Sequence, residues 1–264
     1  MTRLVVVGAG LMGEAIFSGL LASGWAPADI VVSDARAERR AELSERYGVG
    51  SGEAVDAVAD AQTVLLAVKP ADVGGVLEEI GDRLAPDALL LSVCAGVALA
   101  TLQAGVREGT PVVRAMPNTP ARVGEAITAV SPGTHATDDH LAEVTEILGA
   151  VGRVITVAEK YQDSVTAVSG SGPAYVFLVA EAMIEGGVHV GLPRDVATEL
   201  AVQTLFGSAT LLRDTGDHPA ILRENVTSPG GTTAAALRRL EDHGVRAAFL
   251  AAVEAARDRS LELG

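Results

Sequence analysis

The chain has 264 residues and a formal net charge of −14, which argues against partners that present phosphate backbones or anionic membrane surfaces. Its one cysteine, Cys94, excludes an intrachain disulfide and a multi-cysteine zinc site, and its five histidines form no recognisable metal motif. We therefore predict a protein that binds no nucleic acid, no membrane and no metal.

The first residues predict a dinucleotide-binding turn. Residues 4–7 are a continuous apolar run, typical of a parallel strand buried on both faces. They lead into Gly8-Ala9-Gly10-Leu11-Met12-Gly13, and residues 14–23 follow with helical periodicity. This is G-x-G-x-x-G between a strand and a helix, where the glycines serve a tight turn, access for a pyrophosphate and close helix packing.

The second predicted strand, residues 30–34, leaves the choice of cofactor open. Asp34 lies about twenty residues beyond the glycines, where an acidic side chain binds the ribose 2′-hydroxyl of NAD. Ser33 and Arg36 beside it offer donors to the 2′-phosphate of NADP instead. We expect NADPH, with NADH as the alternative cofactor.

Further strands are predicted at residues 63–68, 89–93, 111–115, 126–130 and 154–157, with a helix at 138–148. Lys69 follows the first of these strands, at the strand end where open α/β sheets bind ligands, although a lone surface lysine is an equally good interpretation. We interpret Cys94 as a buried small residue and not a nucleophile, because no cationic partner is near it in sequence. The alternation of strands and helices makes residues 1–158 an α/β, doubly wound domain of Rossmann type.

Residues 159–264 contain no convincing strand and predict an all-helical domain. A helix at 161–168 is followed by a break at 169–173, and further helices are expected at 174–188, 194–212, 219–224 and 245–261. The 174–188 helix is apolar on nearly every side, which predicts burial on all faces and therefore a partner chain. Its apolar run is too short for a membrane span, and no signal peptide precedes the first strand, so we expect a soluble, cytoplasmic protein.

The stretch 225–233, Asn-Val-Thr-Ser-Pro-Gly-Gly-Thr-Thr, predicts a loop that opens a helix. Its adjacent glycines let backbone N–H groups approach a ligand closely, and a helix N-terminus favours an anion. Thr232 and Thr233 either cap this helix or contact the bound group.

Together these motifs resemble the pyrroline-5-carboxylate reductase family over essentially the whole chain. The segments that carry the resemblance are 8–13 (GAGLMG), 67–70 (AVKP), 92–97 (SVCAGV), 114–120 (RAMPNTP), 169–175 (SGSGPAY) and 226–233 (VTSPGGTT). The resemblance implies reduction of L-1-pyrroline-5-carboxylate to L-proline by hydride transfer from NAD(P)H, the last step of proline biosynthesis. It also implies a Rossmann domain followed by an all-α dimerisation domain, in a homodimer that assembles further into a decamer.

The same resemblance implies roles for individual residues. The pyrophosphate is expected on Gly8, Ala9, Gly10, Leu11 and Met12, and the nicotinamide half against Ala67, Val68, Lys69, Ala95 and Asn225. The substrate carboxylate is expected on the backbone of Gly231, Thr232 and Thr233, with the Thr233 hydroxyl facing the imine nitrogen as the catalytic contact. Two positions depart from the family. Cys94 stands where the family usually has alanine, and residues 51–53 replace a stretch that often carries a cofactor-binding asparagine.

Two other functions fit the same scaffold. β-Hydroxyacid dehydrogenases and other imine reductases resemble it, but the former use a catalytic lysine on a long helix of the second domain, and residues 161–264 contain no lysine. A non-catalytic dinucleotide sensor would not need the 230–233 loop.

Overall fold

The computed structural model describes residues 2–263, which form two compact units. The first unit runs to Ser171 and includes the end of the last helix from Ala256, and the second unit runs from Gly172 to Ala255. The boundary predicted after residue 158 marks the place where the strand pattern ends, and it remains a prediction.

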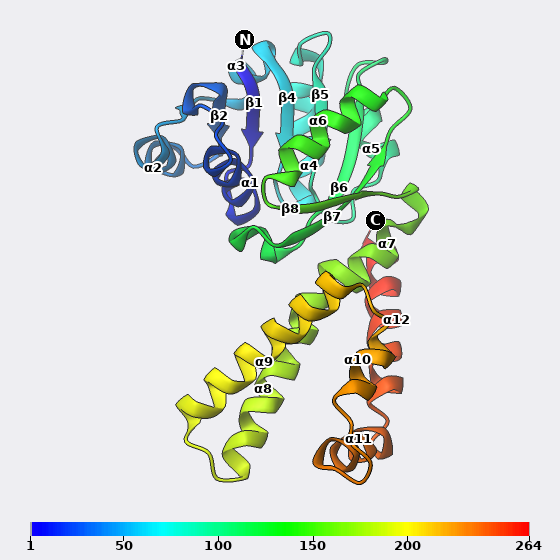
Figure 1. Cartoon of the computed structure of the whole chain (residues 1–264). Coiled ribbons are helices and arrows are strands. Elements are labelled where there is room, and N and C mark those ends of the chain that lie inside the picture. The colour runs from blue at the N-terminus through cyan, green and yellow to red at the C-terminus, as the bar shows by residue number, and fades with distance from the viewer. Residues whose placement is uncertain (1, 264) are drawn as a thin grey trace. The chain divides into compact units, whose positions relative to one another are not determined.

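The first unit is built on one eight-stranded sheet with the order β3-β2-β1-β4-β5-β6-β7-β8 (Figure 1). Its strands are β1 (Thr2–Val7), β2 (Ile30–Ser33), β3 (Gly50–Ser51), β4 (Ala61–Leu66), β5 (Leu89–Ser92), β6 (Val112–Met116), β7 (Ala126–Pro132) and β8 (Gly152–Thr156). The strands from β1 to β6 run parallel. The chain builds outward from β1 to β3 and then returns to β4 on the other side of β1, so the strand order reverses between β1 and β4.

Side chains of the central strands alternate between two cores, one on each face of the sheet. The helices that cover the sheet are α1 (Leu11–Ala22), α2 (Ala37–Tyr47), α3 (Ala54–Ala57), α4 (Val73–Ile80), α5 (Leu99–Ala104) and α6 (Asp138–Gly149). In β1, Leu4 and Val6 belong to the core that also takes side chains from α1, α2 and α6. Val5 and Val7 belong to the opposite core, with side chains from α3, α4 and α5. Burial on both faces explains the uninterrupted apolar run, and the doubly wound prediction is confirmed.

Two strands, β7 and β8, run opposite to the other six, which the sequence did not predict. β7 pairs antiparallel with β6, and β8 then pairs parallel with β7. The connection from β6 to β7 contains only the short 3-10 segment η5 (Thr119–Val123), too short for the crossover that a parallel neighbour needs. The buried Asn118 holds this turn: its Oδ1 accepts from Ile127 N at 3.0 Å, and its Nδ2 donates to Ser169 O at 3.1 Å.

The break predicted at residues 169–173 is wrong. Glu159–His189 is one helical stretch, in which the π-helical turn η7 (Thr166–Gly170) lies between α7 (Gln162–Val165) and α8 (Gly172–His189). The Ser171 N–H donates to Thr166 O at 2.8 Å, five residues back. Such a turn takes up an extra residue without ending the helix, so serine and glycine mark a widened turn and not a loop.

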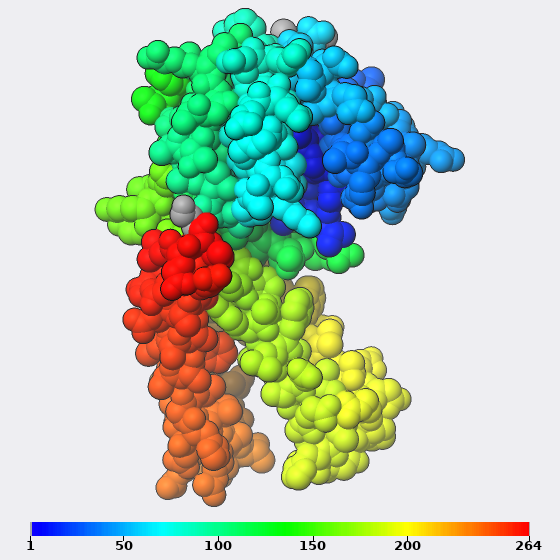
Figure 2. Space-filling model, turned by 180° about the vertical axis from the view of Figure 1, so that it is seen from behind, coloured from blue at the N-terminus to red at the C-terminus, as the bar shows by residue number. Residues whose placement is uncertain are grey.

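The second unit contains α8, α9 (Arg194–Thr215), α10 (Pro219–Asn225), α11 (Thr232–Asp242) and most of α12 (Val245–Leu263). α8 and α9 lie side by side (Figure 1), and Figure 2 shows open space between this pair and the orange α10–α11 segment. Of residues 172–255, only Ala197 and Ala201 are buried. On α8 and α9, Phe177 is 67%, Leu178 66% and Phe206 63% exposed. A single chain therefore leaves the apolar surface of α8 and α9 uncovered, although composition predicts that it should be covered.

We expect this protein to be an oligomer at micromolar concentration. Large apolar side chains such as Phe177 and Phe206 each contribute about 1.5–3 kcal/mol when they leave water, and a partner chain is the means of burying them. Sedimentation velocity near micromolar concentration measures this directly. A folded monomer with native helical content would contradict the expectation.

Candidate functional site

The predicted cofactor residues lie at the carboxyl ends of the parallel strands, which we call the cofactor edge of the sheet. β2, β1, β4 and β5 are parallel neighbours, so their carboxyl ends lie on the same side. Backbone hydrogen bonds link these ends, as from Gly8 N to Ser33 O at 2.8 Å. The predicted residues at or just beyond these ends are Gly8, Ala9, Gly10, Leu11, Met12, Ser33, Arg36, Ala67, Val68, Lys69 and Ala95. The reversal of strand order between β1 and β4 is where ligands of open α/β sheets bind.

The three glycines of the turn do three different things. Gly8 has a φ of +94°, and a Cβ there would lie 2.6 Å from the Ala67 carbonyl oxygen, so only glycine fits. A Cβ on Gly13 would collide with the Gly8 carbonyl oxygen. The absence of a side chain at Gly13 therefore lets α1 pack closely against the turn. A Cβ on Gly10 would meet no atom within 4 Å, so this position opens onto free space. The turn therefore has the close contacts and the open side that a pyrophosphate site requires.

The N-terminus of α1 supplies donors for an anion. Gly10 is its N-cap and offers no capping side chain, and the first helical bond runs from Glu14 N to Gly10 O at 2.9 Å. The N–H groups of Leu11 and Met12 therefore have no acceptor within the helix. Free donors and the helix dipole together favour a negatively charged group at this point.

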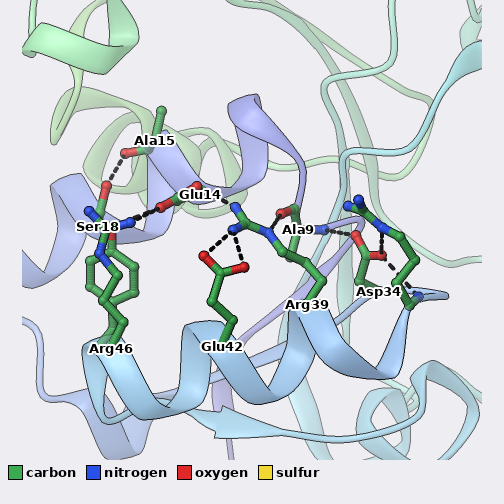
Figure 3. A network of polar contacts seen from close by, with 10 residues as sticks. Ala9, Glu14, Ala15, Ser18, Asp34, Arg39, Glu42 and Arg46 are labelled. Atoms are coloured by element: carbon green, nitrogen blue, oxygen red, sulfur yellow. Dashed lines mark hydrogen bonds and ion pairs between the residues drawn. The ribbon is translucent and has the colours of Figure 1, made fainter.

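Asp34 is turned toward the glycine turn. Its Oδ2 accepts from Ala9 N at 3.2 Å, and its Oδ1 accepts from Arg36 N and Nε, both at 3.1 Å (Figure 3). Burial by itself raises the pKa of the Asp34 carboxyl, but the hydrogen bonds and charge of Arg36 and the Ala9 N–H outweigh it and hold the pKa below its usual value. A carboxylate therefore stands beside the turn, where it can accept a hydrogen bond from a ribose hydroxyl.

The two residues predicted to hold a 2′-phosphate differ in access. Arg36 is 67% exposed and uses its Nε for the bond to Asp34, whereas Ser33 is buried at the end of β2. Arg36 is therefore the better placed donor for an approaching phosphate. Both assignments remain predictions.

The segments after β4 and β5 lie on the other side of the turn. The Val68 side chain packs against Gly8, and Lys69 is exposed just before the short 3-10 segment η3 (Pro70–Asp72). Cys94 is buried, as its interpretation as a small core residue predicts, and burial raises the pKa of its thiol. The adjacent Ala95 is exposed.

The 228–233 loop of the second unit forms a tight turn that leads into α11. Gly230 has a φ of +67°, and the Gly231 N–H donates to Ser228 O at 3.0 Å, which closes a turn. Gly231 is the N-cap of α11, and no side chain caps this helix. Among the described residues, no hydrogen bond of the Thr232 or Thr233 hydroxyl is found, and the first N–H groups of α11 are left for a ligand. Asn225 ends α10 and is exposed.

The sequence did not decide the role of two arginines that lie near the glycine turn. Arg39 and Arg40 lie on α2 with side chains only 16% and 15% exposed. Arg39 Nε donates to Ala9 O at 3.1 Å, and Arg40 donates to the Asp34 carbonyl oxygen at 2.5 Å. Their position shortly after the end of β2 was the available signal, but consecutive arginines on a helix equally fit a solvated face.

The second half of the chain matches a family profile described as "Pyrroline-5-carboxylate reductase dimerisation" over residues 159–263, and residues 3–96 match "NADP oxidoreductase coenzyme F420-dependent". The pyrroline-5-carboxylate reductase of Corynebacterium melassecola is 44% identical, over 100% of this chain and 99% of that protein. The chain belongs to the pyrroline-5-carboxylate reductase family.

Solved structures of the pyrroline-5-carboxylate reductase family agree with this assignment. The enzyme from Coxiella burnetii has a TM-score of 0.95 at 34% identity, over 100% of this chain and 98% of that one. The Plasmodium falciparum structure with NADP bound has a TM-score of 0.89 at 29% identity, over 100% and 98% of the two chains. The resemblance drawn from the motifs and the predicted combination of a Rossmann domain with an all-α dimerisation domain are confirmed.

Alanine at Gly10 and at Gly13 should separate ligand binding from folding. Gly10 has φ −71° and ψ −166°, which alanine adopts easily, so Gly10→Ala should keep its melting temperature but raise the Kd for NADPH about tenfold by placing a methyl group on the open side. Gly13→Ala should lower the unfolding free energy by about 1–3 kcal/mol through the clash with Gly8. Thermal unfolding and NADPH fluorescence titration measure the two effects. Unchanged cofactor affinity in Gly10→Ala would refute the proposed pyrophosphate site.

Proposed function

We infer that this protein is an oxidoreductase that reduces L-1-pyrroline-5-carboxylate to L-proline with NAD(P)H, the last step of proline biosynthesis. Family membership over the whole chain supports this function. The structural observation that carries it is the uncapped N-terminus of α11 behind Gly230 and Gly231. The substrate has a carboxylate and a cyclic imine, and this loop offers unpaired backbone donors beside the Thr233 hydroxyl.

The protein contributes to this reaction by orienting the substrate and the cofactor and by supplying polar contacts to the imine nitrogen. When bound, the reduced nicotinamide would supply a hydride to the imine carbon, and the nitrogen would gain a proton. Holding the imine carbon in reach and excluding water lowers the barrier without any nucleophile or metal ion. Hydrogen-bond donors aimed at the nitrogen favour the transition state, because the nitrogen becomes more basic as the double bond is lost.

We assign different roles to the three residues of the loop. The N–H groups of Thr232 and Thr233 bind the carboxylate, and the Thr233 hydroxyl donates to the ring nitrogen. The Gly231 N–H is already bonded to Ser228 O, and a Cβ on Gly231 would collide with the Ser228 hydroxyl. The contribution of Gly231 is therefore the tight turn that exposes the two threonines.

NADPH is the proposed cofactor, held by the turn from Gly8 to Met12 and by Arg36 at its 2′-phosphate. The match of residues 3–96 to an NADP oxidoreductase profile supports this choice. We place the nicotinamide half against Ala67, Val68, Lys69 and Ala95, and the cofactor contact expected of Asn225 remains a prediction. Asp34 keeps NADH as the alternative, since its carboxylate can accept from a 2′-hydroxyl.

The protein is an oligomer through its dimerisation domain, and we propose a homodimer that assembles into a cytoplasmic decamer. The stretch Glu159–His189 is long and apolar enough to cross a membrane, and only 6% of its most apolar window is buried within the chain. The same residues lie within the match to the dimerisation profile, residues 159–263. We therefore assign the cover of this surface to a second subunit and not to lipid.

Oxidation of NADPH in the presence of L-1-pyrroline-5-carboxylate tests the function. The purified protein should consume NADPH and form proline in equal amounts. A protein that binds NADPH tightly but turns over no imine would be a dinucleotide sensor.

Arg36→Ala should raise the KM for NADPH about tenfold and leave the KM for NADH nearly unchanged, because one charge-assisted contact to the 2′-phosphate is lost. Arg83→Ala is the matched control, since Arg83 is exposed in η4 (Gly81–Arg83), which precedes the amino end of β5, whereas the cofactor residues lie at the carboxyl ends of the strands. Steady-state kinetics with both cofactors give the comparison. Equal effects on NADPH and NADH would remove Arg36 from the phosphate site.

Thr233→Ala should lower kcat by about ten- to a thousandfold, as expected for one preorganised contact at the reacting atom, and Thr233→Ser should keep most of the activity. No capping bond from Thr233 is present, so the melting temperature should change little in either variant. Kinetics at saturating NADPH and thermal unfolding provide the measurements. An alanine variant with normal turnover and a clearly lower melting temperature would make Thr233 a structural residue.

A further inference from the structure

Both peptide groups that flank Ala9, inside the glycine turn, are held by side chains from outside it. The N–H of the preceding peptide, at Ala9, donates to Asp34 Oδ2 at 3.2 Å. The carbonyl of the following peptide, Ala9 O, accepts from Arg39 Nε at 3.1 Å. Figure 3 shows Arg39 rising from α2 to the turn, with Glu14 and Glu42 beside it.

The bond from Arg39 sets the direction of the Gly10 N–H. In a trans peptide, the carbonyl and the following N–H point in opposite directions, and residues 2–263 contain no cis peptide. The Ala9 carbonyl points to Arg39, so the Gly10 N–H points away from α2. If this peptide turned over, a carbonyl oxygen would take the place of a donor and repel an anion.

Arg39 is itself fixed. Its Nη1 donates to both carboxylate oxygens of Glu42, at 3.0 and 2.9 Å, and its Nη2 pairs with Glu14. The side chain is 16% exposed. All three nitrogens therefore have acceptors within the protein, which leaves this guanidinium poorly suited to bind a phosphate itself.

Glu14 lies in the first turn of α1, close to the anion site, and its charge must be compensated there. The Glu14 carboxylate pairs with Arg39 and with Arg46, whose Nη1 lies 3.2 Å from Glu14 Oε1. It also accepts a hydrogen bond from the Tyr47 hydroxyl at 2.9 Å. Burial by itself raises the pKa of Glu14, but the hydrogen bonds from Tyr47 and Arg39 and the charges of Arg39 and Arg46 outweigh it and hold the pKa below its usual value. The ionised Glu14 carboxylate is thus paired with side chains of α2.

We propose that Arg39 is a positioning residue for the dinucleotide. It locks the Ala9–Gly10 peptide with the Gly10 N–H available to the pyrophosphate, and it neutralises Glu14 at the start of α1. The inference rests on the proposed use of NADPH, and it adds a residue that acts on the cofactor through the turn without touching it.

Three variants of the full-length protein test the proposal. Arg39→Met removes the donors and keeps the length of the side chain. Arg46→Met is the matched control, because Arg46 also lies on α2 and pairs with Glu14, while none of its contacts reaches the glycine turn. Arg39→Lys keeps the charge, but a single ammonium group cannot reproduce the fork that joins Ala9, Glu14 and Glu42.

NADPH binding to the three variants is measured by titration, with adenosine 2′-monophosphate as a probe that has no pyrophosphate. Arg39→Met should raise the Kd for NADPH about tenfold, Arg39→Lys about threefold, and Arg46→Met less than twofold. The Kd for adenosine 2′-monophosphate should stay within about twofold in all variants, and kcat at saturating NADPH should also hold within about twofold. A loss confined to the pyrophosphate-bearing ligand is what separates positioning from a general loss of charge or stability.

Equal losses in Arg39→Met and Arg46→Met, or equal losses for both ligands, would overturn the proposal. If Arg39→Met fails to fold, Arg39→Lys decides alone, and an unchanged Kd for NADPH in that variant refutes the role. Wild-type protein that binds neither NADPH nor NADH would defeat the proposed function instead, so the two failures are distinguishable.

Discussion

The cofactor edge depends on the contact between the Gly8 turn and the end of β4. A φ of +94° and a carbonyl oxygen where a Cβ would lie make Gly8 irreplaceable at this point. The tight turn brings α1 directly over the carboxyl end of β1, with its first N–H groups unpaired. Gly13 allows α1 to stay close to the turn, and Gly10 leaves the approach open. The anion site is therefore a consequence of backbone geometry.

Backbone N–H donors can bind an anionic ligand in spite of the negative net charge of this chain. With a formal net charge of −14, an anionic ligand meets an unfavourable overall field. Helix N-termini act over a short range and do not depend on the net charge, and both proposed anion sites, at α1 and at α11, use them. Acidic groups near the first site are paired: Asp34 with Arg36, and Glu14 with Arg39. In both pairs the arginine contributes to holding the pKa of the carboxyl below its usual value.

The helical unit has a different physical basis. Two buried alanines among residues 172–255 cannot hold helices together by themselves, and large apolar side chains on α8 and α9 remain exposed. These exposed side chains lie within the match to a dimerisation profile, which is consistent with an oligomer. We therefore expect assembly and folding of this unit to be coupled, because the single chain buries little of its apolar surface.

The sequence by itself determined the local features of this protein. Glycine spacing after an apolar strand predicts the Gly8 turn, because only glycine permits its backbone conformation, and uninterrupted apolar runs predict strands buried on both faces. The all-round apolar helix over 174–188 likewise predicts a partner. The order of motifs was enough to indicate the family.

Only the tertiary structure decided how distant segments meet. The antiparallel β7 follows from a connection too short for a crossover, and the π-helical turn at Thr166–Gly170 follows from a helix that continues through a segment whose composition predicts a break. In the sequence, Arg39 cannot be told from an arginine on a solvated helix face. In the structure its side chain turns inward to Ala9, because the sheet places the glycine turn beside α2. Spacing in sequence carries no information on such contacts, since they join β1, β2 and α2 through the packing of the whole sheet.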